Sequence, residues 1–489
     1  MRRKLMSDNH FEPVSGVDSA WLRLDRPTNL MVITAMAVVE PIPFNKLKEL
    51  INSRFLAFPR FRQKPVNHSG FYFWEEDPYF SLDYHVRKVA LPQPADKGAL
   101  EKFIGELMST PLDPGKPLWQ VYLIENYGDH HVCVMRVHHC YADGLALVAV
   151  FGSLSDQSPN INPFPLDPGK QRDAGVRARQ SFVMGMETLS RAVEKCTKLR
   201  YRIAEEGKSI LREPGYAVEG VRQGLNGAAE IARLAALEAD DPTPLRGELG
   251  VMKCCTWSEL IPLHKFKEVA LAFGCSINDV LLSCVSGGLR RLLQERMDQV
   301  DGVRLHATLP VNLRPLETRL GREQLQELGN QFGTVFVPLA AGIGNPIERL
   351  YKIKHDMAAL KESMQPSLSH ALLTAMGLFP QGVQQPLLEL FSNKTSMVLS
   401  NVPGARRARY LAGSKVKELM FWVPQTGDIG LGVSLLSYNQ SVQIGINADR
   451  ALLPEPAELT RAMIDALEEY RSLTGMSWQA AEARSHRKA

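Results

Sequence analysis

The feature that most constrains the fold is a division of the chain into two blocks by a stretch of different character. Each block alternates strand-like and helix-like segments, the first over residues 14–156 and the second from about residue 248 onward. Between them lie a Pro/Asn/Asp/Gly-rich loop and a stretch rich in Ala, Arg, Glu and Gly. A chain of 489 residues suits two large domains better than one.

We therefore predict an α/β (α+β) protein made of two halves around a helical insertion. The predicted boundaries are 1–173 for the N-terminal half, 174–247 for the helical, basic insertion and linker, and 248–489 for the C-terminal half.

Composition limits the class of protein. The 45% apolar and 22% charged residues are typical of a globular protein with sizeable cores. A net charge of +4 is too small to indicate nucleic-acid binding, so we expect no nucleic-acid partner. Seven cysteines without a CxxC pair favour free thiols in a reducing compartment. No run of about 18 apolar residues is present, and the N-terminus lacks an apolar signal core. We expect a cytoplasmic protein, either free or on a membrane surface.

Two adjacent histidines occur in the stretch VHHCYADG, residues 137–144. Upstream, two apolar runs flank Gly128-Asp129, which predicts a hairpin with its second strand over roughly 130–139. Side chains alternate along a strand, so His138 and His139 should point in opposite directions. The two histidines are therefore not expected to have the same function or to bind one metal ion together.

The stretch also has a purely structural interpretation. A histidine can cap a strand or satisfy buried polar groups, Asp143 is a natural helix N-cap, and Gly144 permits a tight strand-to-helix corner. Even so, these roles would leave one histidine held at a rigid corner. A general base needs such a fixed geometry.

The second block shows the same alternation. A helix is expected over 277–296, and a final amphipathic helix should end near Gly475 as its C-cap. The strand-like segments are 304–314, 330–340, 395–402 and a hairpin over 432–449.

Asn278 and Asp279 stand at the start of the first of these helices. Ser276 and Asp279 have the spacing of a capping box, which gives Asp279 a local structural reason. Asn278 has no such reason, and helix N-termini favour developing negative charge. Asn312 and Arg314 could anchor Asp143, bind phosphate groups of a ligand or be solvated residues at a strand end.

Seven motifs in order give a specific resemblance. HHCYADG matches the HHxxxDG signature of the CoA-dependent acyltransferase superfamily, which has the chloramphenicol-acetyltransferase-like fold. The chain as a whole resembles the bacterial wax ester synthase/acyl-CoA:diacylglycerol acyltransferases. Besides HHCYADG, the matching motifs are VDSAWL (17–22), PLW (117–119), ND (278–279), NLRP (312–315), GNQFG (329–333) and SNVPG (400–404).

The resemblance implies two chloramphenicol-acetyltransferase-like halves with mixed sheets. It implies an O-acyltransferase that moves a long acyl chain from acyl-CoA, as substrate, to a fatty alcohol or diacylglycerol. The product is a wax ester or triacylglycerol, and neither a cofactor nor a metal is expected. Two alternatives remain open: a CoA-dependent enzyme making a secondary-metabolite ester, and a non-catalytic protein of the lipid-droplet surface.

The resemblance also assigns roles. His139 matches the general base, and His138, Asp143 and Gly144 complete the motif as positioning residues. Asn278 and Asp279 would support the site from the second half. A covalent acyl-enzyme on the neighbouring Cys140 is disfavoured, because adjacent strand residues face apart.

A basic tract lies within the insertion. Residues 177–212 hold nine Lys and Arg against four Glu. Such a run is either a solvated helical face or a docking surface for anionic lipid. The second reading would place the protein peripherally on the inner membrane or on lipid droplets.

Overall fold

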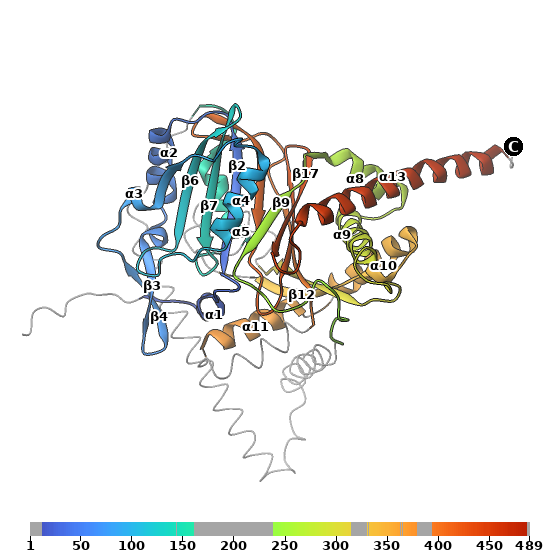
Figure 1. The fold of residues 1–489 in the computed structure, drawn as a ribbon, viewed down its shortest axis with the longest axis horizontal. Coiled ribbons are helices and arrows are strands. Elements are labelled where there is room, and N and C mark those ends of the chain that lie inside the picture. Colours follow the sequence, from blue (N-terminus) through green and yellow to red (C-terminus); the bar gives the residue numbers. More distant parts are fainter. Residues whose placement is uncertain are drawn as a thin grey trace, which may run out of the picture.

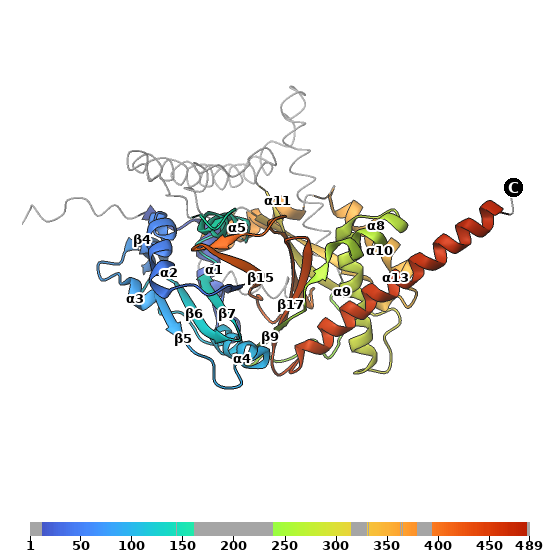
Figure 2. The ribbon, with the colours of Figure 1, turned by 90° about the horizontal axis from the view of Figure 1, so that it is seen from above.

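The computed structural model describes residues 12–142, 144–160, 238–313, 330, 332–361, 363, 365–378 and 394–486. These residues form two seven-stranded sheets, each covered by helices, and a small three-stranded sheet. Figures 1 and 2 show the N-terminal half in blue to teal beside the C-terminal half in green to red. This is the predicted mixed α/β architecture.

The first large sheet has the strand order β5-β6-β7-β2-β15-β14-β8. Strands β6 and β7 form the expected hairpin, with Trp119 opposite Val137, and β7 pairs in turn with β2. Only β5 runs parallel to its neighbour, so the sheet is mixed. The strands are β2 (Val32–Val39), β5 (Val86–Val89), β6 (Trp119–Tyr127), β7 (His130–His138), β8 (Ser155–Asp156), β14 (Tyr410–Leu411) and β15 (Ser414–Trp422).

Two strands of this sheet come from the C-terminal part of the chain. Strand β15 lies antiparallel to β2, with Leu419 opposite Ala37, and β14 joins β15 to β8. In Figure 1 the orange strand stands among the blue and cyan ones. The N-terminal sheet is therefore completed by residues 410–422. Domain boundaries drawn along the sequence do not describe this arrangement, because these residues lie in the C-terminal segment.

Short helices cover the first sheet. Helix α4 begins where the Asp96 carboxylate accepts a hydrogen bond from the Ala99 N–H, as an N-cap does. The helices are α1 (Gly16–Leu24), α2 (Phe44–Leu50), α3 (Leu82–His85), α4 (Lys97–Met108) and α5 (Gly144–Leu154), with a π-helical turn at Ile51–Phe55 and a 3-10 turn at Pro59–Arg62. The small sheet contains β1 (Glu12–Pro13), β3 (Gln63–His68) and β4 (Phe71–Glu76).

The second large sheet has the order β10-β17-β16-β13-β11-β12, and β9 also pairs with β17. It mixes parallel pairs, such as β11 with β13, with antiparallel ones. All the strand-like segments expected in this half are confirmed. The strands are β9 (Lys253–Trp257), β10 (Ile261–Pro262), β11 (Leu305–Asn312), β12 (Phe332–Leu339), β13 (Met397–Pro403), β16 (Leu431–Tyr438) and β17 (Ser441–Asp449).

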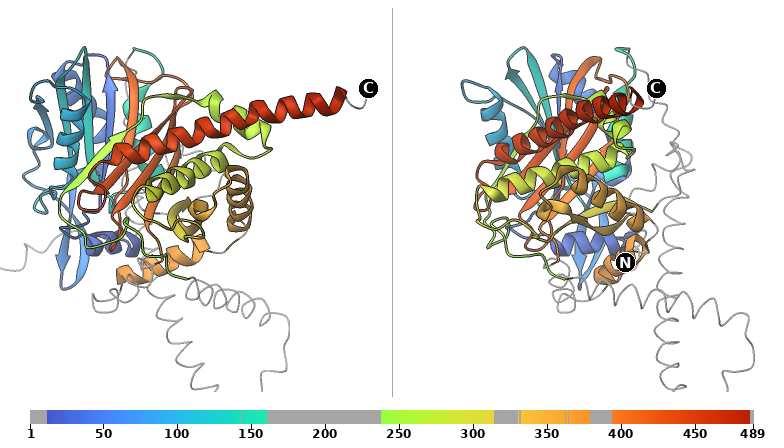
Figure 3. Two further views of the ribbon diagram at one scale, coloured as in Figure 1. Left: turned by 45° about the vertical axis from the view of Figure 1, so that its right-hand side comes forward. Right: turned by 90° about the vertical axis from the view of Figure 1, so that its right-hand side faces the viewer.

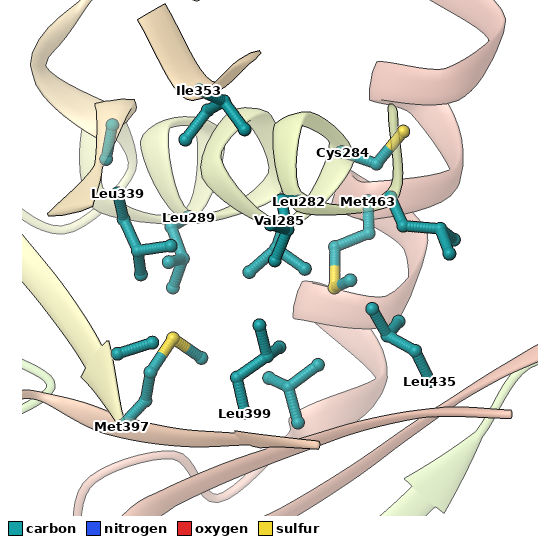
Figure 4. Close-up of a cluster of buried hydrophobic side chains, with 14 of the residues drawn as sticks. Leu282, Cys284, Val285, Leu289, Leu339, Ile353, Met397, Leu399, Leu435 and Met463 are labelled. Carbon is teal, nitrogen blue, oxygen red and sulfur yellow. The ribbon is translucent and has the colours of Figure 1, made fainter. Parts of the chain in front are cut away.

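The core of the second half lies between this sheet and a layer of helices. Helix α9 directs Leu282, Val285 and Leu289 toward Met397 and Leu399 of the sheet (Figure 4). Burial of these side chains holds the helix layer on the sheet. The helices are α8 (Leu263–Ala272), α9 (Ile277–Gln294), α10 (Pro346–Lys361), α11 (Gln365–Leu378) and α13 (Pro456–His486), with a 3-10 turn at Ala340–Gly342.

The expected end of the last helix at Gly475 is wrong. Helix α13 continues to His486, and its C-terminal end extends beyond the body of the protein (Figures 1 and 3). Gly475 is not among the glycines with positive φ. A left-handed C-cap is therefore absent there, and the helix-forming residues that follow prolong the helix.

Candidate active site

The histidine pair lies at a corner held by two neighbouring segments. Strand β7 ends at His138, and α5 begins at Gly144, close to the predicted positions. The His138 N–H donates to the Leu118 carbonyl (3.0 Å), and the His139 N–H donates to the Met31 carbonyl (2.7 Å). The backbone of the corner is thus tied on both sides, to the segments that lead into β6 and β2.

The His139 side chain lies among aromatic rings from both halves. Its ring stacks on Trp21 of α1, with centroids 4.4 Å apart, and Phe332 of β12 is 5.7 Å away. Trp21 and Phe332 are themselves stacked at 5.9 Å. His139 is only 8% exposed. These contacts restrict rotation of the imidazole and shield it from bulk water.

A buried carboxylate and a buried amide meet at the His139 peptide. Asn330 Nδ2 donates to Asp18 Oδ1 (2.6 Å) and to the His139 carbonyl (2.8 Å). The Asn330 N–H also donates to Asp18 Oδ1 (3.2 Å). Asp18 lies on α1, and Asn330 lies just before β12 in the second half of the chain. The network therefore joins the two halves at the histidine corner.

Asp18 is unusual electrostatically. Burial away from water raises the pKa of its carboxyl from 3.8 to about 6, although hydrogen bonds from Asn330 and the charge of Arg60 act in the opposite direction. The carboxylate is thus costly to keep ionised near neutral pH. Desolvation outweighs the hydrogen bonds that the carboxylate receives.

His138 has different neighbours from His139, as the alternation along a strand predicts. Its Nδ1 accepts a hydrogen bond from the Cys140 N–H (3.2 Å). Burial, with a contribution from His139, lowers the pKa of His138 to about 3, so the ring is neutral at physiological pH. Its Nε2 lies 3.8 Å from Asp25 Oδ2, but a neutral ring at that distance does not form an ion pair.

Cys140 is fully buried. Burial raises the pKa of its thiol well above the ordinary value, with the charges of Asp18 and Asp25 acting in the same direction. A thiol is nucleophilic as the thiolate, which this environment disfavours. The surroundings of Cys140 are therefore those of a structural cysteine.

Asn278 and Asp279 begin α9, as expected. The Asp279 carboxylate accepts from the Ser276 N–H (2.8 Å), and Ser276 Oγ accepts from the Asp279 N–H (3.2 Å), so the capping box is present. Asn278 Oδ1 accepts a hydrogen bond from Asn401 Nδ2 (2.7 Å). This contact ties the start of α9 to β13 and gives Asn278 a structural partner.

Two family models together match most of the chain. One, described as the wax ester synthase/diacylglycerol acyltransferase catalytic domain, matches residues 14–281. A second, described as the WS/DGAT C-terminal domain, matches residues 328–471. The chain belongs to the wax ester synthase/diacylglycerol acyltransferase family.

Relatives in this family have similar length. One Mycobacterium tuberculosis protein bearing the name diacylglycerol O-acyltransferase is 25% identical, over 94% of this chain and 90% of the relative. Another from the same organism is 28% identical, over 93% of this chain and 98% of the relative. The chain is therefore an acyltransferase of the acyl-CoA-dependent type, and the rival reading as a non-catalytic surface protein loses its support.

Solved structures confirm the fold class. The wax ester synthase/diacylglycerol acyltransferase from Marinobacter aquaeolei VT8 has a TM-score of 0.65 at 20% identity, covering 95% of this chain and 99% of that one. The first condensation domain of the calcium-dependent antibiotic synthetase has a TM-score of 0.59 at 13% identity, covering 95% and 96%. At these identities the likeness concerns the fold alone.

Several predicted residues fall outside the described part of the chain. Asp143 and Arg314 lie there, as does the basic tract 177–212. Gly144 begins α5 and Asn312 ends β11, but the side chain of Asn312 is not described. Roles suggested for these residues remain predictions.

Four residues of the site had no role assigned from sequence. Asp18 and Trp21 belong to the VDSAWL motif, and Asn330 and Phe332 belong to GNQFG, and both motifs contributed only to the family resemblance. The motifs marked the right segments. That the segments meet at His139 follows from the tertiary fold.

The described ranges also bear on metal binding and on membrane spanning. They contain no group of three or more His, Cys, Asp or Glu side chains placed to hold a metal ion. No single helix there is long and apolar enough to cross a membrane. Within these ranges only α8 and α9, taken together, have the necessary length and composition, and they are bent by 99° relative to each other.

Proposed function

We propose that this acyltransferase joins a long-chain acyl group from acyl-CoA directly to the hydroxyl of a fatty alcohol or diacylglycerol, with His139 as general base. The observation that supports this most is the placement of His139. Its backbone is tied to Met31 and Asn330, its ring is stacked on Trp21, and residues of both halves surround it. A general base must be held in this way to act on a substrate bound between two lobes.

The proposed reaction balances with the imidazole alone. The alcohol oxygen attacks the thioester carbonyl as His139 takes the hydroxyl proton. Collapse of the tetrahedral intermediate breaks the C–S bond, and the imidazolium returns the proton to the departing CoA thiolate. The products are the ester and free CoA, and no cofactor or metal enters the scheme.

The test uses purified protein with palmitoyl-CoA and either hexadecanol or diolein, following free CoA and ester together. His139→Ala should lower turnover by about 100-fold or more, the usual effect of losing a general base. His138→Ala is the matched control: it should act mainly through stability, because that ring is buried and neutral. Near-normal turnover by His139→Ala would contradict the assignment.

Direct transfer has its own test. Cys140→Ala should stay active, because the buried thiol is held in its protonated form. Intact mass after exposure to palmitoyl-CoA without alcohol should show unmodified protein. An acylated protein that forms and decays when alcohol is added would establish a covalent route instead.

We also propose that residues 177–212 dock the enzyme on anionic lipid at the inner membrane or on lipid droplets. The support is the excess of basic residues, nine against four acidic, in a chain whose family acts on water-insoluble lipids. Each basic residue near such a surface contributes roughly 1 kcal/mol at low salt.

Replacing Lys195, Lys198, Arg200 and Arg202 by Gln should release the protein from phosphatidylserine vesicles and leave turnover of a short-chain alcohol unchanged. Binding of this variant equal to that of the parent at low salt would make the tract a solvated helical face.

A further inference from the structure

The contacts around His139 combine two kinds of restraint that come from one helix. Asp18 and Trp21 are three residues apart on α1 and so lie on the same side of the helix. Trp21 stacks on the imidazole of His139. Asp18 accepts a hydrogen bond from the Asn330 side-chain amide, which also donates to the His139 carbonyl. One helix face thus restrains the ring directly and the backbone of the same residue through Asn330.

The orientation of the Asn330 amide follows from its surroundings. The same atom lies 2.6 Å from Asp18 Oδ1 and 2.8 Å from the His139 carbonyl oxygen, and both neighbours are acceptors. Only an NH₂ group can satisfy both, because its two hydrogens serve one acceptor each. The reverse orientation would place an oxygen against two oxygens.

Helix capping accounts for only part of the contacts of the Asp18 carboxyl. The N-cap of α1 is Ser15, whose Oγ accepts a hydrogen bond from the Asp18 N–H (3.1 Å). The helix therefore already has an N-cap side chain. Besides a side-chain interaction with Ser15, the Asp18 carboxylate accepts hydrogen bonds from the side chain and the backbone N–H of Asn330, 312 positions away. Asp18 is only 5% exposed and Asn330 also 5%, and buried polar groups of this kind are costly unless they are paired.

We propose that Asp18 and Asn330 are positioning residues for acyl transfer: through the His139 carbonyl they fix the base relative to substrates bound between the two halves. The inference rests on the proposed role of His139. Loss of the link would let the His139 peptide shift while the substrates still bind. A base displaced by even about 1 Å loses much of its effect, so the step with bound substrates should slow.

The test compares three variants with the parent in steady-state kinetics, varying palmitoyl-CoA and hexadecanol separately. Asp18→Ala and Asn330→Ala should each lower kcat about tenfold or more, with both KM values within about twofold of the parent. Asp18→Asn keeps an oxygen that can accept from Asn330 and should retain kcat within about threefold. Rescue by this isosteric change separates the hydrogen bond from the charge.

Asn126→Ala is the matched structural control. Asn126 also ties a distant backbone, donating to the Leu91 carbonyl and accepting from the Leu91 N–H, both at 2.8 Å. It lies near the end of β6 that is remote from the histidine corner. Its loss should lower the thermal unfolding midpoint but keep kcat.

If Asn330→Ala does not fold, Asn330→Ser replaces it, since a hydroxyl donates one hydrogen bond and cannot serve both acceptors. The proposal is overturned if folded Asp18→Ala and the folded Asn330 variant each keep kcat within twofold of the parent. It is also overturned if Asn126→Ala loses kcat to the same degree. A parent enzyme that releases no CoA, or an active His139→Ala variant, would instead reject the proposed function.

Discussion

At the scale of single residues, burial decides the charge state of Asp18. Its pKa in the folded protein is about 6, against an ordinary value of 3.8, so the folded state holds its proton over that interval more tightly than the unfolded state does. The contribution of Asp18 to the free energy of unfolding is therefore fully present below pH 4 and is lost as the pH rises toward 6. The loss amounts to about 3 kcal/mol at most, since each pKa unit corresponds to roughly 1.4 kcal/mol.

We predict that Asp18→Asn removes the pH dependence of stability that Asp18 causes. Relative to the parent, the variant should gain stability between pH 4.5 and pH 7.5, because its side chain stays neutral throughout. Urea unfolding of both proteins at the two pH values measures the change. An equal difference in unfolding free energy at both pH values would show that Asp18 titrates normally.

At the scale of elements, a glycine permits a close approach of a strand and a helix. A Cβ at Gly333 of β12 would clash with the Pro366 carbonyl group at the start of α11. Here the obstacle is backbone, so the strand or the helix has to move. We expect Gly333→Ala to destabilise the protein by about 1–3 kcal/mol, the usual range for overpacking, as a lower thermal midpoint.

Gly475 provides the opposite case. Nothing lies within 4 Å of a Cβ built there, and the residue is inside α13. Alanine should therefore strengthen the helix by about 0.5–1 kcal/mol, seen as slower amide exchange around residue 475. Faster exchange after Gly475→Ala would indicate a left-handed C-cap at that position.

At the scale of the whole molecule, the two halves depend on each other. Strand β15 completes the N-terminal sheet beside β2, and Asn29 Nδ2 donates to the carbonyls of Gly427 and Ile429, at 2.8 and 3.1 Å. Without residues 410–422, β2 would become an unpaired edge with buried side chains on both faces.

We accordingly predict that residues 1–247 expressed alone are insoluble or unfolded, whereas co-expression with residues 248–489 yields a soluble complex. The full chain should unfold in one cooperative thermal transition. A soluble N-terminal fragment with native near-UV circular dichroism would contradict this interdependence.

The sequence by itself determined the local elements and the histidine corner. The Gly128-Asp129 turn, the alternation along β7 and the Ser276–Asp279 capping box depend on residues close in the chain, and all are present as predicted. The seven ordered motifs determined the family. The end of α13 was misjudged at Gly475 because a glycine permits a C-cap without requiring one.

Only the tertiary structure decided which distant groups meet. The entry of β15 into the N-terminal sheet depends on pairing with β2, a strand nearly 400 residues away, which no local pattern records. The same is true of the contacts from Asn330 to Asp18 and His139, with separations of 312 and 191 residues. Periodicity shows which side of a strand or helix is buried, but the partner that covers it is selected by packing of the whole chain. For that reason the sequence determined where His139 stands, and the fold alone decided what holds it there.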